Sequence, residues 1–364
     1  MMKIKSILLF LIVAFAANAF SQTKTKNIVV VTLDGLRWQE IFRGADSTII
    51  NSEFTPDKKE VNQLFWNDQA EKRRALLMPF LWSTVMQKGQ LYGNRDLGNK
   101  EEVSNPYYFS YPGYNEIMTG FPDKRVNSND KIYNPNINVL EFINQQKGYE
   151  GKVAAFSSWD VFPYILNDKR SGILVNSGID DLKLENPQIN MLNKMQHEML
   201  SPVGDDVRPD VLTYQFAKQF MLDKHPKALY IAFDETDDYA HGGYYQFYLK
   251  QAHNEDKMLK DLWNTIQSDP FYKDQTTLFI TCDHGRGDDT PKSWRSHGTE
   301  IPHSKQTWFA VMGPDTPAKG VMPASSTILY HSQFAQTIAK LLGLDFKSNT
   351  NHEVGDAINS VFSK

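Results

Sequence analysis

Short runs of apolar residues recur along the chain and alternate with longer segments in which apolar residues repeat every three or four positions. The short runs predict strands at residues 27–33, 152–157, 172–176, 228–233, 277–282 and 308–312. The longer segments predict helices at residues 75–88, 138–146, 245–266 and 333–342. Strands that are almost continuously apolar and are separated by helices are typical of a parallel sheet covered on both faces. We therefore expect an α/β fold with a largely parallel central sheet.

Two polar stretches interrupt this alternation, at residues 44–74 and 177–208. Both are long for loops within a compact domain, so we interpret them as inserted cap elements near the mouth of a site. Surface insertions with no role at the site are the alternative. No internal repeat or low-complexity segment is visible. The length of the chain suits one large α/β domain with an inserted cap, or two small domains, and we expect a single catalytic domain over residues 22–364.

The first 21 residues have the pattern of an export signal. Lys3 and Lys5 give a positively charged start, residues 7–17 are apolar, and small residues at 17–19 or 19–21 offer a cleavage site. The apolar stretch is short for a membrane span, although a retained anchor is the alternative. We therefore expect a periplasmic or secreted protein with no stable membrane span once the signal is removed.

The overall charge argues against one class of partner. Loss of Lys3 and Lys5 with the signal would change the formal net charge from −4 to −6. The remaining chain contains no basic patch, so nucleic-acid binding through charge is not expected. Cys282 is the only cysteine and cannot form a disulfide within the chain. Its apolar neighbours indicate a buried strand residue rather than a nucleophile.

Three aspartates lie at or just beyond the ends of predicted strands. Asp34 follows the first strand and precedes Gly35, Asp237 lies just beyond strand 228–233, and Asp283 follows strand 277–282. In open α/β sheets, ligands bind at the carboxyl ends of the strands, so one fold would bring all three to the same edge. An Asp-Gly pair after a strand is also common in turns, which makes Asp34 a weak signal by itself.

Two histidine-containing segments belong to the same pattern. His241 follows Asp237 by four residues, so the two side chains would share one face of a helical turn and could bind one ion. The run at residues 234–238 is more acidic than an ordinary strand end, and a cation would relieve the repulsion between its carboxylates. A solvated acidic turn is the alternative interpretation of this run.

His284 directly follows Asp283, and His297-Gly298 comes later, before the last predicted strand. At a corner between a strand and a loop, two adjacent residues can both turn onto one metal. Ligand sets of Asp and His without Cys favour zinc or a neighbouring borderline metal over calcium or magnesium. Two such ions suit the cleavage of a phosphate ester.

Ser110 is the candidate nucleophile. It precedes Pro112 by two residues, and proline is favoured near the start of a helix. A hydroxyl there would lie at the positive end of the helix, where an alkoxide and a phosphoryl group are both stabilised. A plain helix cap is the alternative, and the metal-ligand pattern favours the nucleophile.

In this order, the segments resemble the alkaline phosphatase superfamily, in the branch of nucleotide pyrophosphatase/phosphodiesterases and their bacterial monoesterase relatives. The resemblance covers about residues 27–345 through separate motifs. It implies an alkaline phosphatase-like catalytic domain that binds two divalent metal ions, expected to be zinc. One metal would be bound by Asp34, Ser110, Asp283 and His284, and the other by Asp237, His241 and His297.

The activity implied by the resemblance is the hydrolysis of small-molecule phosphoric esters through a phosphoseryl intermediate, as a phosphodiesterase or a phosphomonoesterase. The family also has an Asn that binds a phosphoryl oxygen. Asn129 is nearest to that position, and Asn127 is the alternative. His303 competes with His297 for the last metal position, but the family's His-Gly pairing favours His297.

Monoesterase relatives tend to carry a Lys-x-Arg motif near the phosphate, and the comparable segment here is residues 167–170. Arg170 matches the Arg, but Asp168 occupies the Lys position, which argues against a dedicated monoesterase. Whether Lys169 or Arg170 contacts phosphate stays open. The preference for mono- or diesters, the natural substrate and the oligomeric state stay open as well.

Two rival functions use the same segments. A sulfate or phosphonate ester hydrolase could use the same site, and a metal-stabilised binding protein would have lost turnover. Sulfatases of the superfamily need an Arg where this chain has Tyr114, and they have Asn or Gln where it has His284. The aromatic residues Trp38, Tyr111 and Trp159 either line a leaving-group pocket or belong to the core.

Overall fold

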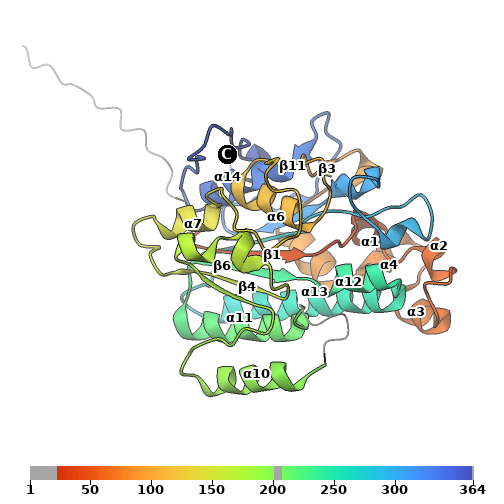
Figure 1. Cartoon of the computed structure of the whole chain (residues 1–364). Coiled ribbons are helices and arrows are strands. Elements are labelled where there is room, and N and C mark those ends of the chain that lie inside the picture. Colours follow the sequence, from red (N-terminus) through yellow and green to blue (C-terminus); the bar gives the residue numbers. More distant parts are fainter. Residues whose placement is uncertain (1–22, 201–206, 363–364) are drawn as a thin grey trace, which may run out of the picture.

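The computed structural model describes residues 23–200 and 207–362. The predicted export signal, at residues 1–21, lies outside the described residues. Among the residues that are described, no helix is long and apolar enough to cross a membrane. The chain forms one large sheet with helices packed on both of its faces (Figure 1).

The large sheet has eight strands in the order β10-β2-β9-β7-β1-β6-β4-β5. Its centre is β1 (Asn27–Leu33), which lies parallel to β6 (Ala228–Phe233) and to β7 (Thr276–Thr281). The parallel part continues through β4 (Val153–Ser157) and β5 (Leu174–Ser177). On the other side, β9 (Phe309–Met312) is antiparallel to β7 and β2 (Gln90–Tyr92), and β10 (Gly320–Val321) pairs with β2. The predicted fold class is confirmed, and each predicted strand is present.

A second sheet of three very short strands lies in the order β11-β3-β8. These strands are β11 (Leu329–Tyr330), β3 (Glu101–Glu102) and β8 (Gln306–Thr307). They were not predicted, because two residues are too few for an apolar run or an alternating pattern.

Successive side chains of β1 enter different cores. Val29, Val31 and Leu33 belong to one hydrophobic cluster, whereas Ile28 and Val30 belong to the other. Side chains alternate between the two faces of a strand, and here both faces are covered. This explains why the central strands are apolar at almost every position.

The helices are divided between these two cores. In Figure 1, α11, α12 and α13 lie below the sheet, and α6, α7 and α14 lie above it. Helices that contribute to the first core are α1 (Trp38–Arg43), α2 (Ser47–Ile50), α3 (Lys58–Phe65), α4 (Ala70–Leu77), η1 (Leu81–Val85), α5 (Met86–Lys88), α10 (Pro187–Glu198), α11 (Asp210–Lys224), α12 (Glu235–Gly242) and α13 (Tyr245–Ser268). Those of the second core are α6 (Ser110–Thr119), α7 (Val139–Asn144), α8 (Phe162–Ile165) and α14 (Phe334–Leu341). Two short helices add one residue each, with Trp294 of η3 (Ser293–Arg295) in the first core and Val361 of η6 (Asn359–Val361) in the second. The other short helices are α9 (Asp168–Ser171), η2 (Arg95–Leu97), η4 (Pro302–Lys305) and η5 (His331–Gln333).

Three of the four predicted helices match α7, α13 and α14 to within a few residues. The fourth, at residues 75–88, is divided. α4 ends at Leu77, and a new helical segment follows from Pro79 into η1 and α5. Proline has no N–H to continue the hydrogen bonds of a preceding helix, which explains the break.

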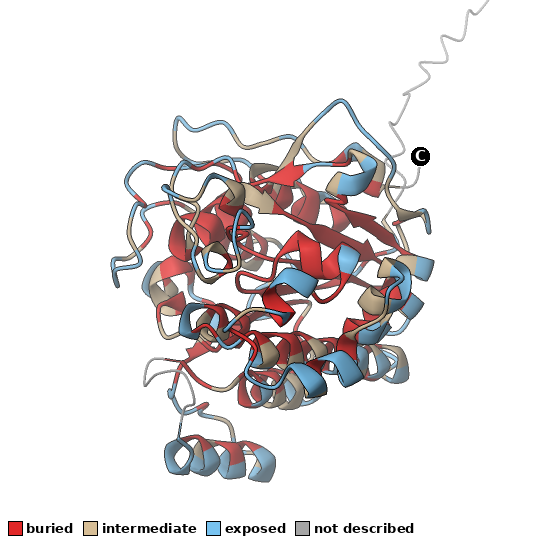
Figure 2. Cartoon of the chain, turned by 90° about the vertical axis from the view of Figure 1, so that its right-hand side faces the viewer, coloured by how far each residue is buried: buried red, intermediate tan, exposed pale blue. Residues whose placement is uncertain are grey.

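The two polar stretches form helices that differ in their packing. Residues 44–74 include α2, α3 and part of α4, and they bury apolar side chains such as Ile49 and Phe65 in the first core. Residues 177–208 include α10, which packs beside α11 and has an exposed outer face (Figure 2). The role of either stretch as a cap stays a prediction, as does the division into a signal and one catalytic domain.

A group of buried acidic side chains lies where α11, α12 and α13 meet. Glu255 of α13 is fully buried. Burial raises the pKa of Glu255 well above its ordinary value, and the negative charges of Asp210 and Glu235 raise it further. Glu255 therefore holds its proton in the folded chain at a pH at which the unfolded chain has released it.

Replacement of this residue should change how stability depends on pH. Because the folded-state pKa is raised, the stabilising contribution of Glu255 is present at acid pH and is lost as the pH rises through that pKa. Glu255→Gln removes this loss, so its stability relative to wild type should increase from pH 5 to pH 9. Urea unfolding at both pH values measures the difference. Glu53→Gln, at an exposed position, is the control. An advantage of Glu255→Gln that is equal at both pH values would contradict the assignment.

Candidate functional site

Ser110 is the first residue of α6. The helix follows Phe109, whose backbone is extended, and Phe109 makes no side-chain capping bond. The Ser110 Oγ instead lies 3.4 Å from His284 Nε2. Pro112 is therefore the third helical residue rather than the first. The hydroxyl stands at the positive end of the helix and faces the predicted ligands.

Asp34, Asp283 and His284 meet at the carboxyl ends of β1 and β7, and all three are buried. His284 Nε2 lies 3.4 Å from Asp34 Oδ1 and 3.4 Å from Asp283 Oδ2. The other ring nitrogen, Nδ1, lies 2.9 Å from the carbonyl oxygen of Gly285 and can donate to it. That bond fixes the tautomer in which the Nε2 lone pair faces the carboxylates.

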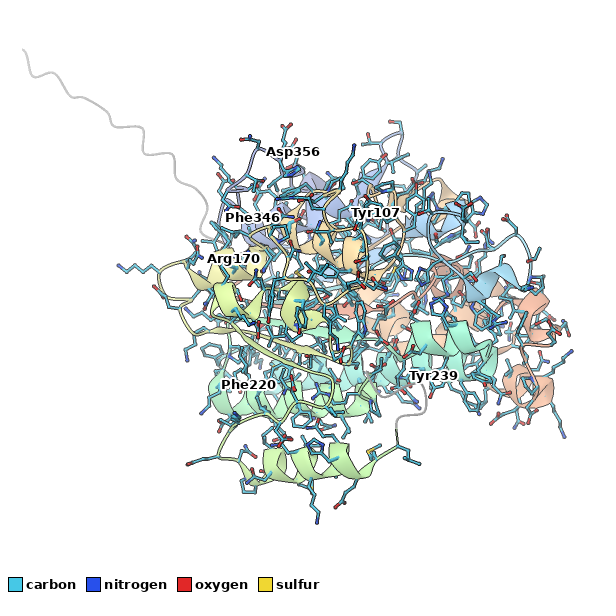
Figure 3. All side chains as sticks on the ribbon, viewed as in Figure 1. Tyr107, Arg170, Phe220, Tyr239, Phe346 and Asp356 are labelled. Atoms are coloured by element: carbon cyan, nitrogen blue, oxygen red, sulfur yellow. The ribbon has the colours of Figure 1, made fainter. Side chains whose placement is uncertain are left out.

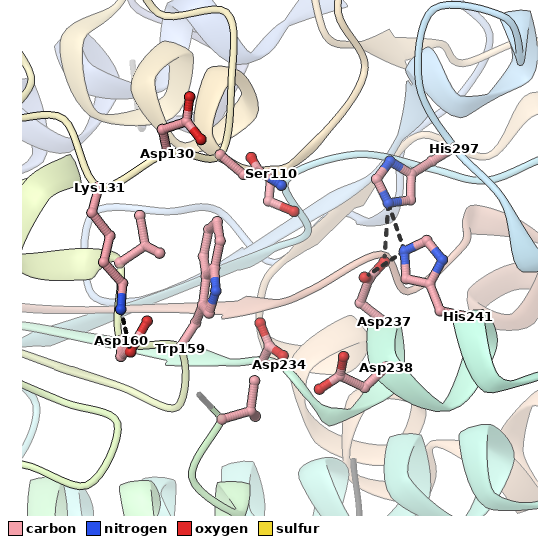
Figure 4. Close-up of a pocket in the computed structure, with 13 residues that line it drawn as sticks. Ser110, Asp130, Lys131, Trp159, Asp160, Asp234, Asp237, Asp238, His241 and His297 are labelled. Carbon is pink, nitrogen blue, oxygen red and sulfur yellow. Dashed lines mark hydrogen bonds and ion pairs between the residues drawn. The ribbon is translucent and has the colours of Figure 1, made fainter. Parts of the chain in front are cut away.

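Asp237, His241 and His297 form the neighbouring group (Figure 4). Asp237 and His241 lie on one face of α12, as their spacing predicts, with 3.0 Å between Asp237 Oδ2 and His241 Nε2. His297 Nε2 lies 2.9 Å from His241 Nε2 and 3.7 Å from Asp237 Oδ1. Its Nδ1 faces the carbonyl oxygen of Tyr108 at 3.2 Å. Two imidazole nitrogens and a carboxylate thus converge on one point.

The residues present fit metal ions. Asp34 Oδ1 and Asp283 Oδ2 are buried and have no hydrogen-bond partner. Such orphaned polar atoms are rare in native proteins, and a cation between them would explain both. The ligand atoms of Asp34, Asp283 and His284 lie within 4.8 Å of one another, as do those of Asp237, His284 and His297.

The pKa values of these groups are shifted in different directions, and each shift has its own cause. Burial raises the pKa of Asp34 well above its ordinary value, and the charges of Asp283 and Asp237 add to the shift. Burial also acts to raise the pKa of Asp237, but the cationic Arg286 and the two nearby imidazoles outweigh it and lower the pKa well below its ordinary value. Burial lowers the pKa of His297, which keeps that imidazole neutral. Neutral imidazoles and ionised carboxylates are the forms that bind metals.

Several supporting residues were not found by sequence reasoning. The Tyr114 hydroxyl donates to Asp34 Oδ2 at 2.7 Å, and the backbone N–H of Gly35 donates to Asp283 Oδ1 at 3.1 Å. Buried Arg286 forms an ion pair with Asp237. The only signal for these contacts was proximity in sequence to a predicted ligand.

Gly113 allows α6 to approach the end of β7. A Cβ atom at this position would lie 2.4 Å from the carbonyl oxygen of Asp283, which is far closer than van der Waals contact. Glycine therefore lets the helix that carries Ser110 contact the loop that carries Asp283 and His284.

A cavity of about 670 Å³ opens beside these groups (Figure 4). Asn129 lines it together with Ser110, and Asn129 Oδ1 accepts a hydrogen bond from the backbone N–H of Tyr111 at 3.0 Å. Asn127, the alternative, lines a different and much smaller pocket beside Arg125. Among the described residues, its lining consists of Ser110, Asn129, Asp130, Lys131, Trp159, Asp160, Val161, Val207, Asp234, Asp237, Asp238, His241 and His297.

Of the three aromatic candidates, only Trp159 lines this cavity. Trp38 is buried in the first core, with its Nε1 donating to Gln306 Oε1 at 2.9 Å. Tyr111 is buried in the second core, and its hydroxyl donates to the carbonyl oxygen of Ile132 at 2.6 Å. The core interpretation therefore holds for Trp38 and Tyr111.

Arg170, one of the two candidates for a phosphate contact, is bonded to groups outside the cavity. The guanidinium of Arg170 binds the carboxylate of Glu141 at 2.8 Å and the carbonyl oxygen of Asn136 at 2.6 Å. Figure 3 shows Arg170 on one side of the molecule and Tyr239, which belongs to α12, on the other. Lys169 lies over the ring of Tyr133. Neither basic side chain lines the cavity.

His303 lies apart from the Asp237 group. Its Nδ1 forms an ion pair with Asp288, and it also lies near Asp289. Of the two candidates for the last ligand position, the structure brings only His297 beside Asp237 and His241.

The hydrogen bond from Tyr114 to Asp34 leads to a testable prediction. Tyr114→Phe should weaken zinc binding by about 10- to 100-fold, because removal of a group that orients a metal ligand typically has this effect. Tyr111→Phe makes the same change on the same helix, but its hydroxyl bonds to backbone carbonyls, so zinc affinity should be retained. Titration against a zinc-binding dye measures both affinities. Equal affinities in the two variants would remove Tyr114 from its positioning role.

Comparison with solved structures relates the fold to known hydrolases. Wild-type alkaline phosphatase PafA aligns with a TM-score of 0.60 at 11% identity, covering 95% of this chain and 100% of the PafA chain. The lipoteichoic acid synthase LtaP from Listeria monocytogenes gives 0.56 at 11% identity, covering 94% and 76%. A putative sulfatase from Bacteroides thetaiotaomicron gives 0.57 at 12% identity, covering 92% and 74%. At these identities the likeness shows the alkaline phosphatase-like fold alone.

The sequence comparisons are more specific about the family. No curated protein matches the chain significantly. The family of type I phosphodiesterases / nucleotide pyrophosphatases matches residues 45–293. This range includes Ser110, Asp237 and Asp283, whereas Asp34 and His297 lie outside it. Because the match covers more than half of the 364 residues, the chain belongs to the type I phosphodiesterase / nucleotide pyrophosphatase family.

Proposed function

We propose that this protein is an exported, zinc-dependent phosphoric ester hydrolase that acts through a phosphoseryl intermediate. The family to which the chain belongs is that of type I phosphodiesterases / nucleotide pyrophosphatases, and an alkaline phosphatase and a putative sulfatase share its fold. The observation that carries the proposal is the position of Ser110. Its hydroxyl stands at the start of α6 and faces His284, beside two buried carboxylate oxygens that have no hydrogen-bond donor.

The metal-binding residues would form two adjacent sets. Asp34, Ser110, Asp283 and His284 would hold one ion, and Asp237, His241 and His297 would hold the other. When bound, the two ions would supply positive charge to the attacking and leaving oxygens of an in-line displacement. Tyr114 and Arg286 keep Asp34 and Asp237 in place.

Ser110 supplies the nucleophile. Its Oγ attacks phosphorus and forms a new P–O bond, while the bond to the ester oxygen breaks and the alcohol leaves. Water then attacks the phosphoserine, which releases the phosphate product and restores the hydroxyl. The positive end of α6 favours the alkoxide form of Ser110 and the negative phosphoryl oxygens next to it.

Asn129 is suited to hold a phosphoryl oxygen. Its side-chain oxygen already accepts the N–H of Tyr111, which fixes the orientation of the amide. The NH₂ group is then the part that can donate to a negatively charged oxygen in the cavity. The backbone N–H that binds Asn129 belongs to Tyr111, the residue after Ser110. The proposed nucleophile and the proposed oxygen-binding group are therefore positioned together.

Two observations favour phosphate over sulfate esters. The position at which sulfatases need Arg is Tyr114, whose hydroxyl is bonded to Asp34. The position at which sulfatases have an amide is His284, whose Nε2 faces two carboxylates. Both residues support a site for two transition-metal ions and an unmodified serine.

The metal assignment makes a paired prediction. Purified protein should contain about two zinc ions per chain, and chelation should abolish activity reversibly. His297→Ala should lose one ion and most turnover. His303→Ala, which removes a histidine bound to Asp288, should lose neither. Elemental analysis by mass spectrometry and hydrolysis of p-nitrophenyl esters measure both quantities. The reverse outcome for the two variants would show that the ligand assignment is wrong.

The role of Ser110 makes a separate prediction. Ser110→Ala should lower kcat by about a thousandfold or more, as expected when a covalent nucleophile is lost, yet retain both metals because six other ligands remain. Ser110→Thr should keep part of the activity because it retains a hydroxyl. Mass spectrometry of the peptide around Ser110, after an acid quench during turnover, should detect a phosphate adduct. A full-rate Ser110→Ala would exclude the covalent route, and an aldehyde at Ser110 would indicate a sulfatase.

A further inference from the structure

Tyr108 has a backbone conformation that is uncommon for its residue type, with a φ of 54° in the left-handed region. In the described part of the chain, three other residues besides glycine have a positive φ, namely Asn167, His225 and Asp274. Asn, His and Asp adopt this region several times more often than other residue types, so Tyr108 is the exception. Such strain persists only where surrounding contacts hold it, and it is concentrated at functional sites. Tyr108 lies two residues before Ser110, which makes its conformation a feature of the site.

The carbonyl group of Tyr108 shows what this conformation does. Its oxygen lies 3.2 Å from His297 Nδ1. A carbonyl oxygen can only accept a hydrogen bond, so the ring proton is on Nδ1 and the lone pair is on Nε2. Nε2 is the atom that lies 2.9 Å from His241 Nε2 and 3.7 Å from Asp237 Oδ1. The orientation of one peptide group therefore decides which nitrogen of His297 is able to bind a metal.

The side chain of Asn105 binds the backbone that leads into Tyr108. Its Oδ1 accepts hydrogen bonds from the N–H of Tyr107 at 3.0 Å and from the N–H of Tyr108 at 3.1 Å. Asn side chains commonly stabilise turns through bonds of this kind to the following backbone. Asn105 is buried, with 1% of its surface exposed, so water does not compete for these bonds. One oxygen thus holds the two peptide groups that precede the Tyr108 carbonyl.

Glu116 of α6 holds Asn105 in turn. The Glu116 carboxylate is fully buried, and its Oε2 accepts hydrogen bonds from Asn105 Nδ2 at 3.0 Å and from the Asn105 N–H at 2.8 Å. Its Oε1 accepts from Ser104 Oγ at 2.6 Å and from the N–H of Ser332 at 3.1 Å. Hydrogen bonds to a charged acceptor are stronger than those between neutral groups. Glu116 and Ser110 belong to the same helix, so the loop before the proposed nucleophile is fixed to the helix that carries it.

We propose that Asn105 and Glu116 are positioning residues for the metal-binding form of His297. They hold Tyr108 in its left-handed conformation, and the Tyr108 carbonyl then fixes the proton on His297 Nδ1. This inference rests on the proposed function, because it takes His297 as a metal ligand. Since α6 carries both Glu116 and Ser110, the same contacts join the proposed nucleophile to a ligand of the other metal.

Two substitutions of Tyr108 test the role of its conformation, and both remove the aromatic ring. Asn adopts the left-handed region readily, whereas the β-branched Val does not. An imidazole N–H gives an NMR signal where a hydrogen bond slows its exchange with water. Zinc-loaded protein with isotope-labelled histidine should show this signal for His297 Nδ1 in wild type and in Tyr108→Asn. Tyr108→Val should lose it, and the spectrum of His297→Gln identifies the signal.

A second pair of variants tests Asn105. Asn105→Ala should lose the same NMR signal and should bind one of the two zinc ions about 10- to 100-fold more weakly, as measured by competition with a zinc-binding dye. Asn138→Ala is the matched control. Asn138 is fully buried, accepts from the N–H of Glu141 at 2.9 Å and donates to the carbonyl oxygen of Leu166 at 2.9 Å. Its loss should lower the free energy of unfolding in urea but leave both zinc affinities unchanged.

The possible outcomes separate this inference from the proposed function. Equal zinc affinities in Asn105→Ala and Asn138→Ala would reduce Asn105 to a structural role and overturn the inference. A wild-type NMR signal in Tyr108→Val would overturn it as well, and this result decides the matter even if Asn105→Ala does not fold. A wild-type protein that binds zinc but hydrolyses no phosphate ester would contradict the proposed function, whereas the signal and the zinc affinities would still test the positioning of His297.

Discussion

The main physical constraint on the site is that its buried carboxylates repel one another, so other groups must offset their charges. The sheet brings Asp34, Asp237 and Asp283 together at its carboxyl edge, and burial removes the water that would otherwise separate their charges. Tyr114 and Arg286 each relieve part of this repulsion by bonding to one carboxylate. Two oxygens still lack a hydrogen-bond donor, and the cations of the proposed function would complete the arrangement.

A second constraint is the close contact between α6 and the end of β7. Gly113 removes the side chain that would keep the helix away from the Asp283 carbonyl. As a result, Ser110 at the start of the helix reaches His284, and Tyr114 one turn later reaches Asp34. One helix thus positions the proposed nucleophile and supports a proposed metal ligand, which explains why the whole of α6 is buried.

Sequence patterns predict the central sheet of this protein better than they predict its individual side-chain contacts. Continuous apolar runs identify the central strands, because both faces of those strands are covered, and strand ends identify Asp34 and Asp283. The short edge strands have no such pattern. Contacts such as those of Arg286 with Asp237, or of Arg170 with Glu141, join residues far apart in the chain. Sequence spacing therefore could not show that Arg286 supports the site, or that Arg170 is bonded to groups outside the cavity.

The central claim is that two cations hold the carboxylates and imidazoles together. Anomalous X-ray diffraction at the zinc edge, from crystals grown with zinc, tests it most directly. We expect two peaks, one between Asp34, Asp283 and His284 and one between Asp237, His241 and His297. A single peak, or zinc bound only at Asp288 and His303, would contradict this account of the site.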